Sequence, residues 1–183
     1  MLVSDRLDLA SRAAQLRDHG RVPGDKKFWN TEVAFKYKMS SMQAALGLAQ
    51  LERIDELLAR KREAFAWYNE ELGNIDGLAL NAEPVGTRNA FWMATAVLSP
   101  ELGIAKFELM DRLARRGIDT RPFFHPLSAL PAYEGIPEAA RARARNEVAY
   151  RVGQYGVNLP SSLRLTREDV RRVGKALREA LRD

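Results

Sequence analysis

The sequence predicts an α+β fold in which several helices pack on one small sheet. Its 183 residues are 46% hydrophobic and 29% charged, which is typical of a globular protein. This length is enough to bury a core and corresponds to one ordinary domain or to one and a half small domains. A stretch beginning at Ser41 has no proline before Pro84 and can form an unusually long helix. Beyond residue 73 the expected elements follow as strand, strand, helix, strand, helix, strand, helix, an order that indicates helices layered on a sheet.

The first 38 residues predict a strand remnant, one helix and a long loop. Residues 1–3 can be the end of a strand, and a helix capped by Ser4 or Asp5 is expected to run to about residue 19. Residues 20–38 should then form a loop that exposes two aromatic side chains among several basic ones, Phe28 and Trp29 among Arg21, Lys26 and Lys27. A loop of about 18 residues without structure of its own is unusual in a compact domain and is often functional.

The long helix has a specific start signal. Ser40 and Gln43 have the spacing of a capping box, so the helix should begin at Ser41. With no glycine between Gly47 and Gly73, up to about 32 helical residues are allowed, roughly 48 Å of helix. Such a helix should present a site at its N-terminal end and pack a second body along its length.

The C-terminal part alternates short strands and helices. Strands are expected at residues 78–80, 90–98, 118–121 and 157–159, and helices at 106–116, 138–153 and 167–181. Thr166 and Asp169 form a weaker cap for the last helix. Pro122 and Pro126 keep the segment between them extended and irregular, because neither can donate a backbone hydrogen bond.

Composition and charge exclude several function classes. The net charge is +5, but the arginines after residue 138 are interleaved with acidic residues at helical spacing, which is typical of a solvated helix face. No nucleic-acid-binding motif accompanies them, so no nucleic-acid partner is expected. There is no secretory signal and no apolar run near the ~20 residues of a membrane span, and the chain has no cysteine. A cytoplasmic protein that binds no membrane is the expectation.

Residue chemistry alone gives few catalytic signals. The two histidines, His19 and His125, have neither a nucleophile-elbow context nor metal-ligand spacing, and no glycine-rich phosphate loop is present. The better candidate is anion binding by Lys36-Tyr37-Lys38 ahead of Ser40-Ser41, where helix N–H groups and two ammonium groups favour a phosphate. Equally, both lysines can be solvated loop charges. His125 near Arg121 can bind a ligand or be structural, and Phe91 and Trp92 are expected in the core.

Three separated blocks carry a resemblance to a known family. They are Leu16-Arg17-Asp18-His19-Gly20, then Phe35-Lys36-Tyr37-Lys38-Met39-Ser40 with Gln43-Ala44-Ala45-Leu46-Gly47-Leu48-Ala49-Gln50-Leu51, then Gly117-Ile118-Asp119-Thr120-Arg121-Pro122-Phe123-Phe124-His125-Pro126-Leu127. In this order they resemble the nucleotide-sugar aminotransferases of the DegT/DnrJ/StrS family, which are fold-type-I, pyridoxal-phosphate-dependent α/β enzymes. The third block looks closest to the branch that makes perosamine-type amino sugars.

The resemblance implies a function and a cofactor. Such an enzyme moves an amino group, usually from glutamate, onto a keto sugar carried by a nucleotide, for surface polysaccharide or O-antigen synthesis. The cofactor is pyridoxal 5′-phosphate, and the enzymes are homodimers whose loop before the long helix crosses to the partner's site. That loop carries an Asn-Tyr-Arg triplet in the family and Lys36-Tyr37-Lys38 here, so these residues are implied in cofactor binding, although Lys38 lacks the bidentate geometry of arginine. Arg121, Phe123 and His125 match the segment that lines the sugar side of the pocket.

The resemblance also implies that this chain is the C-terminal portion of such an enzyme. Residues 1–39 would be the end of the large cofactor-binding domain with the partner-crossing loop, residues 40–72 the long interdomain helix, and residues 73–183 the small α+β domain. The Schiff-base lysine would lie upstream, and none of the lysines Lys26, Lys27, Lys36, Lys38 or Lys61 occupies its position. The chain alone should be inactive. The alternative is a non-catalytic interaction or dimerisation module, either one half of a split enzyme or a vestigial fragment.

Overall fold

The computed structural model describes residues 2–21, 24 and 29–183. They form two compact units, Met1–Arg53 and Ile54–Asp183. The predictions for Lys26, Lys27 and Phe28 lie outside the described residues. No helix in the described part of the chain is long and apolar enough to cross a membrane.

The first unit holds α1 (Leu7–Leu16) and α2 (Ser41–Leu51). The predicted cap of α1 is wrong, since Arg6 is its N-cap without a side-chain bond and the Ser4 hydroxyl only accepts the N–H of Arg6. The predicted strand remnant is also wrong where it is described, because residues 2 and 3 are exposed and belong to no strand.

The chain turns back on itself after α1. His19 and Gly20 have φ angles of 63° and 67°, and a Cβ at Gly20 would lie 2.6 Å from the carbonyl oxygen of Glu32. Only glycine fits that position without strain. The returning segment then pairs with the end of α1, because the amides of Tyr37 and Lys38 both donate to the carbonyl of Arg17, at 2.8 and 3.0 Å.

The capping box that opens α2 is confirmed, but the expected continuous helix is not. Ser40 and Gln43 exchange both capping bonds. The helix then ends at Leu51, and α3 (Ile54–Leu72) begins after a two-residue turn. There the amide of Arg53 bonds to the carbonyl of Gln50, three residues back, and the α-helical ladder is interrupted. No proline or glycine marks this break.

The second unit is built on a four-stranded sheet of order β1-β2-β4-β3, in which every neighbouring pair is antiparallel. Its strands are β1 (Leu78–Leu80), β2 (Thr95–Leu98), β3 (Arg121–Pro122) and β4 (Gly156–Asn158). β2 starts five residues later than predicted, because residues 91–94 form an irregular turn. The α+β layer predicted for this region is confirmed.

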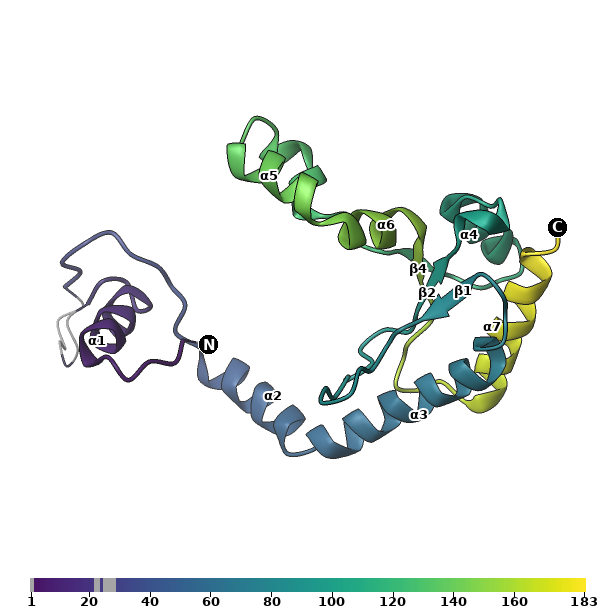
Figure 1. Cartoon of the computed structure of the whole chain (residues 1–183). Coiled ribbons are helices and arrows are strands. Elements are labelled where there is room, and N and C mark those ends of the chain that lie inside the picture. The colour runs from purple at the N-terminus through teal and green to yellow at the C-terminus, as the bar shows by residue number, and fades with distance from the viewer. Residues whose placement is uncertain (1, 22–23, 25–28) are drawn as a thin grey trace. The chain divides into compact units, whose positions relative to one another are not determined.

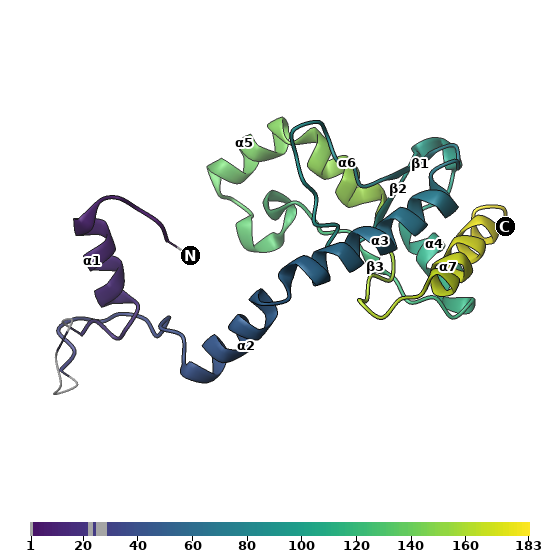
Figure 2. The same ribbon diagram turned by 90° about the horizontal axis from the view of Figure 1, so that it is seen from below.

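Helices cover the sheet and close the core. α3 and α7 (Arg167–Ala180) lie side by side in both ribbon views (Figures 1 and 2), and α4 (Lys106–Arg115) packs on α7. The capping box of Thr166 and Asp169 at the start of α7 is confirmed. The largest fully buried side chains come from the helices and from β4: Tyr68, Leu72, Leu109, Leu113, Val157, Val170 and Leu177.

The arginine-rich region contains two helices where one was predicted. α5 (Pro137–Arg145) and α6 (Glu147–Tyr155) are separated by Asn146, whose φ of −102° and ψ of 47° are not helical. Short 3₁₀ turns occupy residues 100–102, 127–129 and 131–133. α6 contacts β2 and β4. The segment that follows β3 touches both α6 and β4, since a Cβ at Gly153 would lie 3.0 Å from Pro126 and the amide of Phe123 donates to the carbonyl of Gly156.

Candidate functional site

The two loop lysines converge on one aspartate. The Nζ atoms of Lys36 and Lys38 lie 3.5 and 3.2 Å from the carboxylate oxygens of Asp18. The hydrogen bond from Lys38 and the charges of both lysines hold the pKa of Asp18 below its ordinary value. The cluster therefore carries a net charge of +1, less than two free lysines would give. Asp18 belongs to one of the three family-like blocks, but no local pattern predicts this role for it, since its contacts with Lys36 and Lys38 span 18 and 20 residues.

Some of the groups predicted to bind an anion are already occupied by hydrogen bonds within the protein. The capping box consumes the N–H groups of Ser40 and Gln43 and both of their side chains. Tyr37 remains 74% exposed and stacks on Phe35, with ring centroids 5.1 Å apart. One exposed loop thus carries Lys36, Tyr37 and Lys38. Their ammonium and hydroxyl groups can donate hydrogen bonds to an anion, and the two ammonium groups also donate to Asp18.

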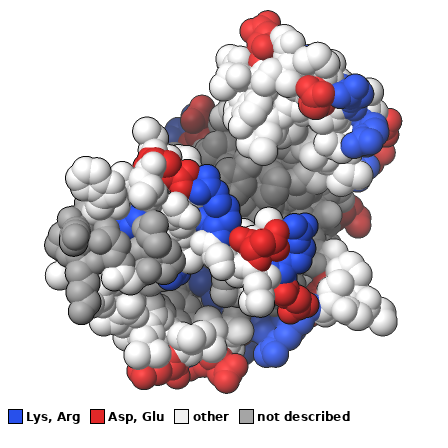
Figure 3. Space-filling model, turned by 90° about the vertical axis from the view of Figure 1, so that its left-hand side faces the viewer, with Lys and Arg blue, Asp and Glu red and all other residues white. Residues whose placement is uncertain are grey.

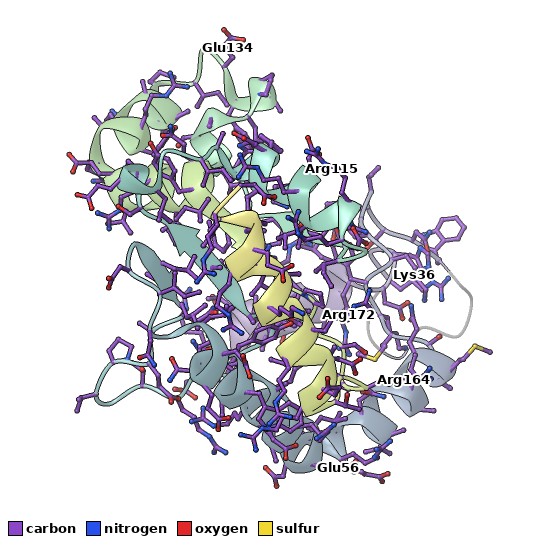
Figure 4. All side chains as sticks on the ribbon, turned by 90° about the vertical axis from the view of Figure 1, so that its right-hand side faces the viewer. Lys36, Glu56, Arg115, Glu134, Arg164 and Arg172 are labelled. Atoms are coloured by element: carbon purple, nitrogen blue, oxygen red, sulfur yellow. The ribbon has the colours of Figure 1, made fainter. Side chains whose placement is uncertain are left out.

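Of the three residues expected on the sugar side of the pocket, Arg121 and His125 border different hollows. Arg121 is exposed, bonds to Asp119 at 2.7 Å, and borders a hollow of about 490 Å³. Arg172 of α7, labelled in Figure 4, lines the same hollow. His125 borders a different hollow, of about 430 Å³, together with Lys106 and the end of α6. Phe123 stands between these two residues in the sequence, and its amide donates to the carbonyl of Gly156 at 2.9 Å.

Two lysines that the sequence did not distinguish tie the second unit together. Lys61 on α3 donates its ammonium to the carbonyls of Trp92, at 2.9 Å, and Ser161. Lys106 is only 4% exposed and donates to the carbonyl of Gly153. Burial lowers the pKa of both amines. Both side chains therefore act as bridges between backbone segments.

A strained turn at Phe91 buries the ring of Phe91 and exposes the side chain of the next residue, Trp92. Phe91 has a φ of 46°, which is rare for a bulky residue, and it is 7% exposed, so its predicted place in the core is confirmed. Its ring stacks on Phe65, with centroids 3.8 Å apart, and the guanidinium of Arg62 lies 5.2 Å from its centroid. The core prediction is wrong for Trp92, which is 65% exposed.

Charged groups brace this turn from α3. The guanidinium of Arg62 binds both carboxylate oxygens of Glu83, at 2.7 and 2.8 Å, and the carbonyl of Asn89 at 2.6 Å. Glu83 also accepts the N–H of Asn89, whose side chain in turn accepts the N–H of Phe91. The bonds from Arg62 and from the Asn89 amide lower the pKa of Glu83 from 4.5 to about 2.

The hydrogen bonds of Glu83 should make the free energy of unfolding fall as the solution becomes acidic. Because the folded-state pKa is depressed, this contribution is fully present above about pH 4.5 and is lost as the pH falls toward 2. Glu83→Gln is expected to flatten the decline of the urea midpoint across that window. Glu134→Gln, at an exposed carboxylate labelled in Figure 4, is the control and should leave the decline unchanged. An unaltered pH profile in Glu83→Gln would contradict the assignment.

The surface charges form local pairs. On the face drawn in Figure 3, lysine and arginine side chains lie beside aspartates and glutamates. The predicted pairs on the C-terminal helix are confirmed by Arg171 with Glu168 at 3.6 Å and Lys175 with Glu179 at 3.9 Å. Exposed pairs of this kind contribute little to stability, typically about 0–1 kcal/mol.

Comparison with known proteins identifies the family. The chain is 35% identical over 182 residues to a GDP-perosamine synthase of Caulobacter vibrioides, covering 99% of this chain and 47% of the relative. It is 32% identical to a GDP-perosamine synthase of Vibrio cholerae, over 94% of this chain and 46% of the relative. The structure of DesI with its TDP-sugar product superposes with a TM-score of 0.77 at 26% identity, covering 98% of this chain and 44% of DesI.

These matches confirm the resemblance and the fold-type-I architecture that it implied. The chain spans about half the length of the relatives it matches, 47% and 46% for the two synthases. Another protein similar to this chain is a Bacillus subtilis protein named a putative pyridoxal phosphate-dependent aminotransferase. That name supports the expected cofactor. Residues 1–178 of its 183 match the family model, and this chain therefore belongs to the DegT/DnrJ/EryC1/StrS aminotransferase family.

Proposed function

We propose that this chain forms the C-terminal portion of a pyridoxal-phosphate-dependent enzyme that transfers an amino group, from glutamate, to a nucleotide-linked keto sugar. The product would serve surface polysaccharide or O-antigen synthesis in the cytoplasm, which the lack of cysteine fits. The observation that carries the proposal is the 35% identity to a GDP-perosamine synthase across 99% of the chain.

The Schiff-base lysine is proposed to lie outside this chain. Among the lysines that the structure describes, burial lowers the pKa of Lys61 and Lys106, which is the usual way to activate an amine. Lys61 instead donates to two backbone carbonyls and Lys106 to one. Lys36 and Lys38 are exposed and paired with Asp18. No described lysine is thus both activated and free to bond the cofactor.

The loop residues fit the phosphate of the cofactor better than its reactive carbon. Two ammonium groups and the exposed Tyr37 hydroxyl can donate to phosphate oxygens, and Asp18 keeps both lysines beside one another until an anion binds. When bound, pyridoxal phosphate supplies an electron sink for the amino-group transfer. On this proposal the residues of this chain bind and orient the phosphate, while Phe123, Arg121 and His125 contribute to the sugar side.

The first unit also offers a surface for a partner subunit. Large apolar side chains of α2 are exposed, with Met42 at 83%, Leu46 at 68% and Leu51 at 65%. Exposed apolar patches mark interaction sites. We propose that a second copy of the enzyme or its lysine-bearing half covers them, with residues 1–39 belonging to the large domain, 40–72 forming the interdomain connection as α2 and α3, and 73–183 forming the small domain.

Reconstitution tests the proposal. The chain alone, incubated with pyridoxal phosphate and borohydride, is expected to give no stoichiometric adduct on a single lysine. The same chain expressed together with the coding sequence that precedes it in its genome should bind the cofactor and aminate a nucleotide-linked keto sugar with glutamate. A stoichiometric adduct on the chain alone would contradict the assignment of the lysine. Failure of the longer protein to aminate any such sugar would contradict the function. Light scattering of the two proteins would show whether the longer one forms a different oligomer from the chain alone.

A further inference from the structure

An exposed pair of aromatic side chains lies outside the residues assigned so far. The rings of Trp92 and Phe124 have centroids 6.4 Å apart and planes within 8° of parallel. Trp92 is 65% exposed and Phe124 is 58% exposed. Both belong to the second unit but come from segments 32 positions apart, so their alignment is a tertiary feature. Exposing two large apolar rings to water is unfavourable in free energy, and a ligand that covers them would gain from burying this surface.

The position of Trp92 is fixed by strain and by charge. The left-handed backbone of Phe91 would be unfavourable by itself and persists because the Asn89 side chain, the Phe65 ring and the Arg62 guanidinium hold it. The next residue is fixed by Lys61, whose ammonium binds the Trp92 carbonyl. A strained turn that delivers an indole to solvent indicates a functional constraint on that indole.

The position of Phe124 is fixed from the sheet edge. Phe123 is bonded to Gly156 of β4, and its ring lies 5.7 Å from that of Phe124 at an angle of 55°. The backbone of Phe124 packs closely on α6, because a Cβ at Gly153 would lie 3.2 Å from its carbonyl oxygen. Both rings of the pair are thereby held on rigid backbone, which lowers the entropy that a ligand must overcome to bind them.

We propose that Trp92 and Phe124 stack the nucleobase of the nucleotide-linked sugar. The inference rests on the proposed function and adds a base-recognition site to it. Because the ring planes are nearly parallel, one flat heterocycle can lie parallel to both of them. Stacking on aromatic side chains tolerates every base, since each has a π-face. That tolerance fits relatives whose names carry different nucleotides, a GDP-perosamine synthase and DesI with its TDP-sugar product.

Nucleotide titration of the full chain tests this site. GDP and TDP are expected to quench the fluorescence of Trp92 and to shift its indole N–H resonance, whereas inorganic pyrophosphate, which lacks a base, should do neither. Trp92→Leu should weaken GDP binding by about 5- to 150-fold, the usual range for loss of one stacking ring. Phe124→Leu should weaken it in the same direction. Trp29→Leu is the matched control, since it removes an indole that is 73% exposed in the other unit, and it should bind GDP like the wild type.

Each result decides the inference. Equal GDP affinity in Trp92→Leu and the wild type would overturn it, as would an equal response to pyrophosphate or no response to either nucleotide. If Trp92→Leu fails to fold, Phe124→Leu still decides, because it keeps all three tryptophans and its GDP affinity is compared with the wild type by the same titration. The outcome is separate from the proposed function: amination that is independent of Trp92 overturns only this inference, whereas base-dependent binding without amination by the longer protein overturns only that function.

Discussion

Replacing Lys61 by methionine is expected to lower the free energy of unfolding by about 2–3 kcal/mol, because a charged donor to two backbone carbonyls is lost while its apolar stem is kept. The carbonyls belong to Trp92 and Ser161, which lie in different segments, so the change should also loosen the turn that carries Trp92. Urea unfolding measures the first effect. The second should appear as a change in tryptophan emission below the unfolding transition.

Lys175→Met is the matched control for this change. Lys175 is 76% exposed on α7 and lies 3.9 Å from Glu179, so its loss should alter stability by less than about 0.5 kcal/mol. If Lys61→Met is as stable as this control, the cost of burying the ammonium equals the value of its two hydrogen bonds. Lys61 would then have no net structural role, and its exclusion as the Schiff-base lysine would lose its physical basis.

Several features that depend on neighbours in the sequence were predicted correctly, although the cap of α1 was not. The capping boxes at Ser40 and Thr166 join residues three apart, so the pattern itself contains the interaction. The order of strands and helices after residue 73 follows from local periodicity in the same way. The break at Glu52 and Arg53 was missed because helix propensity is good on both sides of it and only the hydrogen bonding of the backbone changes there.

Features of the site depend on distant contacts and could not be predicted. Alternating apolar residues favoured a strand from residue 90, yet Arg62 and Phe65 hold Phe91 in a turn from about 30 positions away. Asp18 likewise meets Lys36 and Lys38 only after the chain reverses at Gly20. Arg121 and His125 are close in sequence, but β3 and the extended backbone after it direct them to different hollows. Family resemblance identified the segment without fixing where its side chains lie.

Gly156 connects the candidate ligand segment to the sheet, and Gly156→Ala is expected to lower the free energy of unfolding by about 1–3 kcal/mol. The added Cβ would lie 2.6 Å from the carbonyl oxygen of Val152 and 2.7 Å from the Cβ of Phe123. Alanine can adopt the backbone there, since φ is −84°, so the loss isolates the steric clash. Displacing Phe123 should also move Phe124 relative to Trp92, and GDP affinity should fall with stability.

Gly47→Ala makes the same chemical change where no atom lies within 4 Å of the new Cβ. Because Gly47 is inside α2, alanine should stabilise that helix by about 0.5–1 kcal/mol. Opposite signs in the two variants would trace the loss at Gly156 to its contacts with Val152 and Phe123. A Gly156→Ala protein with wild-type stability and GDP affinity would mean that the segment moves away from β4 without cost. In that case the sheet edge would not position Phe124, and the aromatic pair would lack the rigid support on which base stacking depends.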